Sequence, residues 1–115
     1  MRRAAKVDAN QGEIVAALRK SGCSVSPLHT VGGGVPDLLV GVADLNMLME
    51  VKDGAKPPSA RKLTPDQIEW HSAWQGQKVV VETVAQALHA VASYLSLHGQ
   101  NAPPLLIAML TALAG

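Results

Sequence analysis

The 115-residue chain has few of the sequence features that are typical of proteins in oxidising compartments or membranes. Its only cysteine, Cys23, excludes an intrachain disulfide and a cysteine-based zinc site, and it predicts a reducing compartment. The longest apolar run, residues 105–110, is far shorter than the ~20 residues that cross a bilayer. Arg2, Arg3 and Lys6 are followed by polar residues where a signal peptide needs an apolar run. We therefore expect a soluble, cytoplasmic protein with no membrane partner.

The chain also lacks an excess of charge of one sign. Ten Lys and Arg against nine Asp and Glu give a net charge of +1, which excludes binding to a polyanion by charge alone. None of these residues lies after position 82. Residues 1–36 hold five basic and two acidic side chains, whereas residues 37–53 hold four acidic and one basic. An acidic centre thus follows a basic segment, and a divalent cation bound there would cancel much of its charge.

Hydrophobic residues make up 48% of the chain, enough for the core of one domain. Apolar spacing predicts a helix over residues 8–21 and a strand over residues 23–29. Residues 37–42 and 45–52 are two short apolar runs around a turn at Ala43–Asp44. This pattern predicts an antiparallel hairpin.

Two helix starts follow the hairpin. Thr64 with Gln67, and Thr83 with Gln86, have the spacing of capping boxes. The apolar run at residues 78–82 between the two helices predicts a buried strand. The order α-β-β-β-α-β-α indicates an α/β (α+β) domain with one mixed sheet over residues 1–99. Residues 100–115 add a short apolar C-terminal helix, which we expect to pack on the core or on a partner subunit.

The residues that indicate chemistry are Asp37, Glu50 and Lys52. Glu50 and Lys52 are two apart on a predicted strand and share a face. If the hairpin loop holds an even number of residues, Asp37 lies across from Glu50, and two facing carboxylates repel each other. A divalent cation such as Mg²⁺ would relieve this repulsion. With the Lys52 ammonium beside it, the arrangement suits metal-assisted hydrolysis of a phosphodiester.

Each of these residues also has a plainer interpretation. Asp37 and Glu50 can be ordinary carboxylates at strand ends, with Lys52 as a salt-bridge partner of Glu50. Glu13 can be a solvated glutamate at the edge of its helix, and Gln67 can serve its capping box alone.

The spacing of these residues resembles that of a known nuclease superfamily. Pro36-Asp37, twelve intervening residues and then Glu50-Val51-Lys52 match the PD-(D/E)xK pattern of restriction-endonuclease-like nucleases. More narrowly, the chain is similar to the stand-alone virus-type replication–repair nuclease (VRR-NUC) domain. Supporting matches are Asn10-Gln11-x-Glu13, Gly34-x-Pro36-Asp37 and LTPDQIEWHSAW at residues 63–74. The similarity covers roughly residues 8–98.

The resemblance implies a restriction-endonuclease-like fold and a metal-dependent endonuclease that hydrolyses DNA phosphodiester bonds with Mg²⁺ or Mn²⁺. It implies a homodimer in a bacterial or phage-infected cell, similar to Holliday-junction resolvases, that cuts branched DNA in repair or recombination. The implied catalytic residues are Asp37, Glu50, Lys52 and Gln67, and the implied metal ligands are Asp37, Glu50, the Val51 carbonyl and Glu13. Two alternatives stay open: a nuclease-fold module that binds branched nucleic acid without cutting it, and a nuclease acting on flaps, ends or RNA.

Other residues bear on the substrate. Lys56, Arg61 and Lys62 flank the acidic centre, and we expect them to contact the DNA backbone. Trp70 and Trp74 are one helical turn apart, and we expect them to anchor a core or an interface before they stack on bases. No helix directly follows the glycines at 32–34, so we expect no P-loop and no nucleotide cofactor.

Overall fold

The computed structural model describes residues 7–115, so Arg2, Arg3 and Lys6 lie outside the described residues. Within that range the helices are α1 (Gln11–Lys20), α2 (Pro65–Ala73), α3 (Val84–Leu97) and α4 (Pro104–Ala114), with a 3₁₀ turn η1 (Pro58–Ala60) before α2. The strands are β1 (Ser24–Pro27), β2 (Leu38–Val42), β3 (Leu45–Val51) and β4 (Lys78–Val81). This order confirms the predicted sequence of elements and the α+β class.

The four strands form one mixed sheet in the order β1-β2-β3-β4. The first three are antiparallel neighbours, and β4 runs parallel to β3 after the α2 crossover. In the β2–β3 hairpin Val42 pairs with Leu45, which leaves Ala43 and Asp44 as a two-residue loop. The predicted hairpin is confirmed, and its loop has the even length on which the argument for a facing Asp37 and Glu50 depends.

The hairpin turn uses an unfavourable backbone conformation for its residue types. Ala43 and Asp44 both have positive φ, 49° and 62°, as a type I′ turn requires. A left-handed conformation costs an alanine about 1 kcal/mol, and asparagine tolerates it better.

We therefore expect Ala43→Asn to raise the melting temperature by about 4 °C, the shift that roughly 1 kcal/mol gives a domain of this size. Differential scanning calorimetry measures the shift. Ala55→Asn is the matched control, because Ala55 is also exposed but its φ is not positive. An equal shift in both variants would contradict the assignment of strain to the turn.

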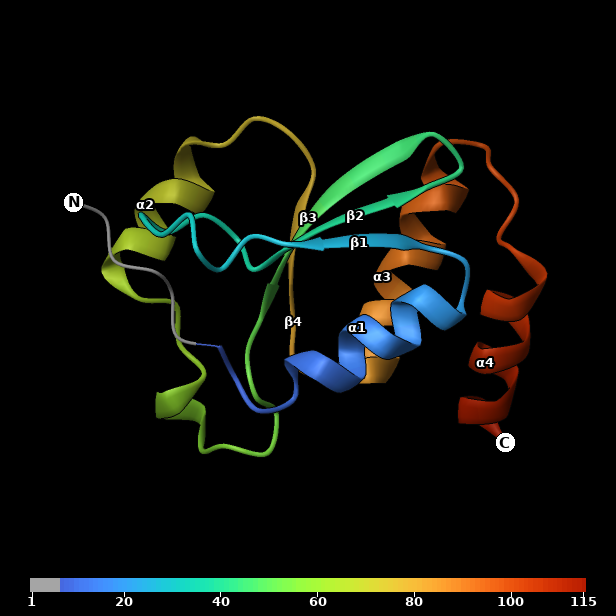
Figure 1. Cartoon of the computed structure of the whole chain (residues 1–115), viewed down its shortest axis with the longest axis horizontal. Helices are drawn as coiled ribbons and strands as arrows, with labels where there is room; N and C mark the ends of the chain where they lie inside the picture. The colour runs from blue at the N-terminus through green and yellow to red at the C-terminus, as the bar shows by residue number, and fades with distance from the viewer. Residues whose placement is uncertain (1–6) are drawn as a thin grey trace.

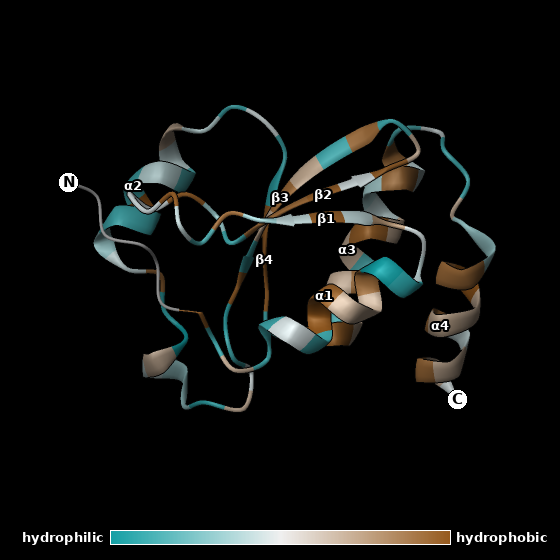
Figure 2. Ribbon diagram, viewed as in Figure 1, coloured by the Kyte–Doolittle hydropathy of each residue, from teal (hydrophilic) through white to brown (hydrophobic). Residues whose placement is uncertain are grey.

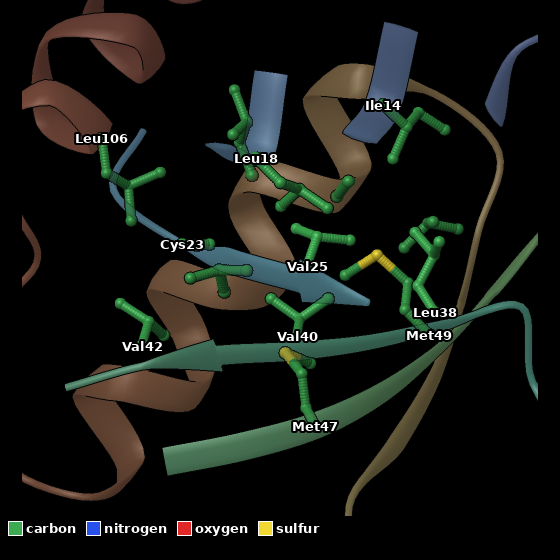
Figure 3. Packing of buried hydrophobic residues seen from close by; sticks show 14 of the residues in the cluster. Ile14, Leu18, Cys23, Val25, Leu38, Val40, Val42, Met47, Met49 and Leu106 are labelled. Atoms are coloured by element: carbon green, nitrogen blue, oxygen red, sulfur yellow. The ribbon is translucent and has the colours of Figure 1, made fainter. Parts of the chain in front are cut away.

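The core lies on one face of the sheet, under α1 and α3, with α4 packed beside α3 (Figure 1). Alternate residues of β2 and β3 point into it, as expected for a sheet with one covered face (Figure 3). Its fully buried large side chains, apart from Glu50, are Ile14, Leu18, Leu38, Val40, Met49, Val51, Val81, Leu88, Val91, Leu95 and Leu106.

The opposite face of the sheet is open in its middle. Leu39 and Val80 point away from the core and are 38% and 40% exposed. Asp37, Glu50 and Lys52 alternate with core residues and therefore belong to this same face. The candidate catalytic residues thus lie on the face that α1 and α3 leave uncovered.

Helix α2 stands apart from the other helices, at one end of the molecule (Figure 1). None of its residues is buried, and Ile68 and Trp74 are 53% and 43% exposed. Trp70 and Trp74 therefore do not anchor the core, and their role at an interface stays a prediction. Sequence periodicity did not reveal this, because the apolar residues of α2 are spread over two faces and none of them meets the core.

The elements begin and end close to the predicted positions, with two informative differences. Residues 8–10 precede α1, because the Asn10 side chain donates to the carbonyls of Lys52 and Glu82 at 3.1 and 3.0 Å. At the start of α3, Thr83 accepts from the Gln86 amide, but the Gln86 side chain accepts from the Glu82 amide and not from Thr83. The second capping box is therefore only half formed.

The uncharged C-terminal segment forms α4. Leu106 is fully buried, whereas Leu105, Ile107 and Leu113 are more than half exposed. Figure 2 shows that α3 and α4 are more apolar than α2, which lies at the other end of the molecule. Among the described residues, no helix has both the length and the apolar character needed to span a bilayer.

Candidate catalytic site

Asp37 and Glu50 face each other at the edge of the hairpin. Leu38 pairs with Met49, so the next step of the same register brings Asp37 opposite Glu50. Both side chains are buried, with exposed fractions of 4% and 2%. Asp37 Oδ2 accepts from the Val51 amide at 2.8 Å, which fixes the Asp37 carboxylate against β3. The register therefore agrees with the pairing that an even loop predicts.

Lys52 and Gln67 complete a polar cluster, which we define as Asp37, Glu50, Lys52 and Gln67. Lys52 Nζ donates to Gln67 Oε1 at 2.8 Å, and Gln67 Nε2 donates to Glu50 Oε2 at 3.3 Å. Lys52 is only 8% exposed, although it is a lysine on the open face. Because its ammonium binds Gln67, a simple salt bridge with Glu50 does not describe its role.

Gln67 serves two purposes with one side chain. Its side-chain Oε1 accepts from the Thr64 backbone N–H at 2.9 Å, and the Gln67 backbone N–H donates to Thr64 Oγ1 at 3.3 Å, which completes the predicted capping box. The same oxygen accepts from Lys52. Since α2 has no buried residue, these polar contacts are a main attachment of its N-terminus to the sheet.

The environment of Glu50 disfavours its ionised form. Burial, hydrogen bonding with Asp37 and the Asp37 charge raise the pKa of Glu50 to about 9, and the Lys52 ammonium only partly opposes them. Without a further cation, Glu50 therefore keeps a proton at neutral pH. The proton relieves the repulsion between the two facing carboxylates.

The same pair offers unused ligand capacity. In the ionised form of Glu50, its buried Oε1 accepts no hydrogen bond from any donor among residues 7–115. Mg²⁺ binds oxygen ligands and typically takes one or two carboxylates together with water or phosphate oxygens. In the described part of the chain no three His, Cys, Asp or Glu side chains gather at metal-binding range. Asp37 and Glu50 thus fit a two-carboxylate site that needs further oxygens from backbone, water or substrate.

The other two implied ligands differ in position. Val51 lies between Glu50 and Lys52 with its side chain in the core, and its amide is bound to Asp37. Glu13 is exposed on α1, and within residues 7–115 it makes no hydrogen bond or ion pair with the polar cluster. The structure therefore does not bring Glu13 together with Asp37 and Glu50.

The residues just before α1 approach the site instead. Asn10 holds the Lys52 and Glu82 carbonyls together, and the Asp8 charge contributes to the raised pKa of Glu50. Asn10 belongs to the Asn10-Gln11-x-Glu13 match, but its linking role was missed. The signal available in the sequence was a polar amide directly before a helix, a residue type that bonds to backbone groups.

A pocket of about 270 Å³ opens beside the cluster. Lys52 and Gln67 form part of its wall, together with Gly32, Gly33 and Gly34. All three glycines have positive φ, and a side chain on Gly34 would collide with the Asp66 carbonyl at the start of α2. Gly34 therefore lets the chain pass close to the start of α2 shortly before it reaches Asp37.

The three basic residues expected to contact DNA are not equivalent. Lys56 forms an ion pair with Asp8 at 2.9 Å, and Arg61 forms one with Glu82 at 3.0 Å. Lys62 is exposed and makes no ion pair within the described residues. Lys56 and Arg61 thus tie the loop after β3 to the rest of the domain, which leaves Lys62 as the most available of these three cations.

No protein-family model, curated protein or solved structure matches this chain.

Proposed function

We propose that the chain is a metal-dependent endonuclease that hydrolyses DNA phosphodiester bonds. The observation that carries the proposal is the buried pair of facing carboxylates, Asp37 and Glu50, with the Lys52 ammonium on the same sheet face. Keeping two carboxylates face to face costs stability, so a role that uses both is the economical explanation. The similarity to the PD-(D/E)xK pattern supports the same interpretation.

Asp37 and Glu50 would hold the divalent cation. When bound, such a cation polarises a phosphoryl group and lowers the pKa of water. The Asp37 carboxylate is already oriented by the Val51 amide. Glu50 has to release the proton that it holds in the metal-free protein, so binding is favoured as the pH rises.

Lys52 would act on the reacting groups directly. Gln67 fixes its ammonium at the wall of the pocket, where its N–H donors can orient a water molecule or stabilise charge on a phosphate oxygen. In the reaction a water molecule gives up one proton as its oxygen bonds to phosphorus, one phosphorus–oxygen ester bond breaks, and the leaving oxygen takes up a proton. Gln67 is a positioning residue, because its contacts are with Glu50 and Lys52.

Branched DNA, cut by a homodimer, is the substrate that the resemblance favours. The test is incubation of the purified protein with Mg²⁺ and labelled four-way junction, flap, duplex and single-stranded DNA, with EDTA as the control. We expect Mg²⁺-dependent cutting with a preference for branched substrates. Binding of the junction without cutting would instead identify a non-catalytic module, and equal cutting of all four would contradict a junction resolvase.

A further inference from the structure

A second, apolar cleft lies on the same open face of the sheet as the polar cluster. It measures about 360 Å³ and its walls are almost entirely apolar. It lies between the hairpin and the end of α2, and it is lined mainly by Leu39, Asn46, Leu48, Trp74, Gly76 and Gln77.

One wall of this cleft is an indole held in place without being buried. Trp74 stacks on Trp70 with ring centroids 4.9 Å apart and an interplanar angle of 18°. A side chain on Gly76 would meet the Trp74 ring nitrogen at 2.8 Å, so the glycine leaves room for the indole. Lys78 Nζ donates to the Trp74 carbonyl at 3.0 Å. Trp74 nevertheless remains 43% exposed.

The hairpin register connects the apolar cleft to the polar cluster. Leu39 pairs with Leu48, and each lies two residues along its strand from Asp37 or Glu50. Residues two apart share a face and are about 7 Å apart along a strand. The apolar cleft and the carboxylate pair are therefore neighbouring sites on one face of the sheet, at a spacing that a single extended nucleotide can span.

The chemistry of the cleft matches a nucleobase. A base has two flat apolar faces that stack on an aromatic ring, and polar edges that amide side chains recognise. Trp74 supplies the ring, and Asn46 and Gln77 are the amide residues among those that line the cleft, although they add little polar surface to its walls. No carboxylate lines the cleft, so nothing there repels the phosphates of a DNA strand. The positive Lys78 ammonium, which donates to the Trp74 carbonyl, lies next to the cleft and attracts them.

We propose that the cleft beside Trp74 binds one unpaired nucleobase of a DNA strand whose adjacent phosphodiester lies at the polar cluster. The inference rests on the proposed nuclease function and narrows its substrate class. A base held in this cleft cannot be paired at the same time. The preferred substrates are therefore DNA forms that have an unpaired nucleotide beside the cut or can release one at a branch point, and a fully paired linear duplex is a poor substrate.

The test compares binding by Trp74 variants on an Asp37→Asn background, so that the DNA stays intact. Fluorescence anisotropy with a labelled forked oligonucleotide and with a blunt duplex of equal length gives the two affinities. Stacking on one base corresponds to about a 5- to 100-fold change in affinity. We expect Trp74→Ala to lose that much for the fork and little for the duplex, and Trp74→Phe to retain most of it.

Ile107→Ala is the matched control, because Ile107 is a similarly exposed apolar residue on α4. Circular dichroism checks folding. If Trp74→Ala does not fold, Leu39→Glu, which places a negative charge in the cleft, is expected to weaken fork binding in the same way. Unchanged fork affinity in a folded Trp74→Ala or Leu39→Glu variant would overturn the inference.

Two further results separate this inference from the proposed function. If wild-type protein cuts branched DNA but the Trp74 variants bind and cut normally, only the base cleft is wrong. If wild-type protein neither binds nor cuts DNA, both proposals fail. An apolar face can also be covered by a second copy of the chain, and sedimentation velocity tests this alternative. A wild-type dimer that dissociates on Trp74→Ala would show that the cleft is a contact between copies and would overturn base binding.

Discussion

Asp37→Asn and Lys52→Ala should each reduce DNA cleavage by at least about 100-fold while the protein remains folded. Removing one group that stabilises charge in a transition state typically costs this much or more. Asp37→Asn takes away one carboxylate of the facing pair but keeps an oxygen that can accept from the Val51 amide. Lys52→Ala removes the ammonium that Gln67 positions at the pocket. Initial rates on a labelled four-way junction measure the loss.

The chain offers matched controls for both changes. Asp44→Asn removes an exposed carboxylate at the other end of the same hairpin, and Lys20→Ala removes an exposed ammonium from α1. Both should cut at the wild-type rate. Full activity in a folded Asp37→Asn or Lys52→Ala protein would refute the assignment of the site.

Glu50→Gln should abolish cleavage and at the same time stabilise the metal-free protein at pH 8. The folded protein raises the pKa of Glu50 from 4.5 to about 9. Between these values folded Glu50 keeps a proton that the unfolded chain has released, so the wild type loses stability as the pH rises from 4.5 to 9. Glutamine has no proton to lose, and its amide can still donate to Asp37.

The expected gain at pH 8 is at most about 5 kcal/mol, because pH 8 lies about 3.5 units above the unperturbed pKa of 4.5 and each unit of pKa shift corresponds to about 1.4 kcal/mol. The gain should disappear near pH 4.5. Urea unfolding in EDTA at several pH values measures it. Glu13→Gln is the control, since Glu13 is exposed, and we expect it to leave the free energy of unfolding unchanged at pH 8. A Glu50→Gln protein less stable than wild type at pH 8 would mean that Glu50 is ionised in the folded state.

The hairpin and its carboxylate pair could be predicted from the sequence because their geometry is local. Ala43 and Asp44 separate two apolar runs. With two residues in the loop, the pairing of every residue on one strand with a residue on the other is fixed by counting outward from the turn. Asp37 therefore had to meet Glu50 once the turn was placed. The phase of Lys52 follows from the two-residue period of the strand.

Gln67 shows how two competing interpretations can hold together. Its spacing from Thr64 predicts a capping box, and the motif comparison predicts a place near the catalytic centre. In the structure the Gln67 side chain binds both Thr64 of the capping box and Lys52 and Glu50 of the polar cluster, because the N-terminus of α2 lies directly over that cluster. A sequence motif alone does not report such an overlap.

The features that could not be predicted depend on how separate elements sit in space. Glu13 and Asn10 belong to the same motif, yet only Asn10 reaches the end of β3, because α1 begins later than its apolar period indicated. The exposure of Trp74 follows from the position of α2 beyond the sheet, and the spacing within that helix carries no information about it.

The most direct test of the central claim, that Asp37 and Glu50 form a divalent-cation site, is thermal unfolding at pH 8 in 10 mM MnCl₂ and in EDTA. A site with a dissociation constant near 1 mM would stabilise the folded state by about 1.4 kcal/mol at this concentration. We predict a rise of several degrees in wild-type melting temperature that EDTA reverses and that Asp37→Asn and Glu50→Gln lack. No shift in the wild type, or the same shift in all three proteins, would contradict the account.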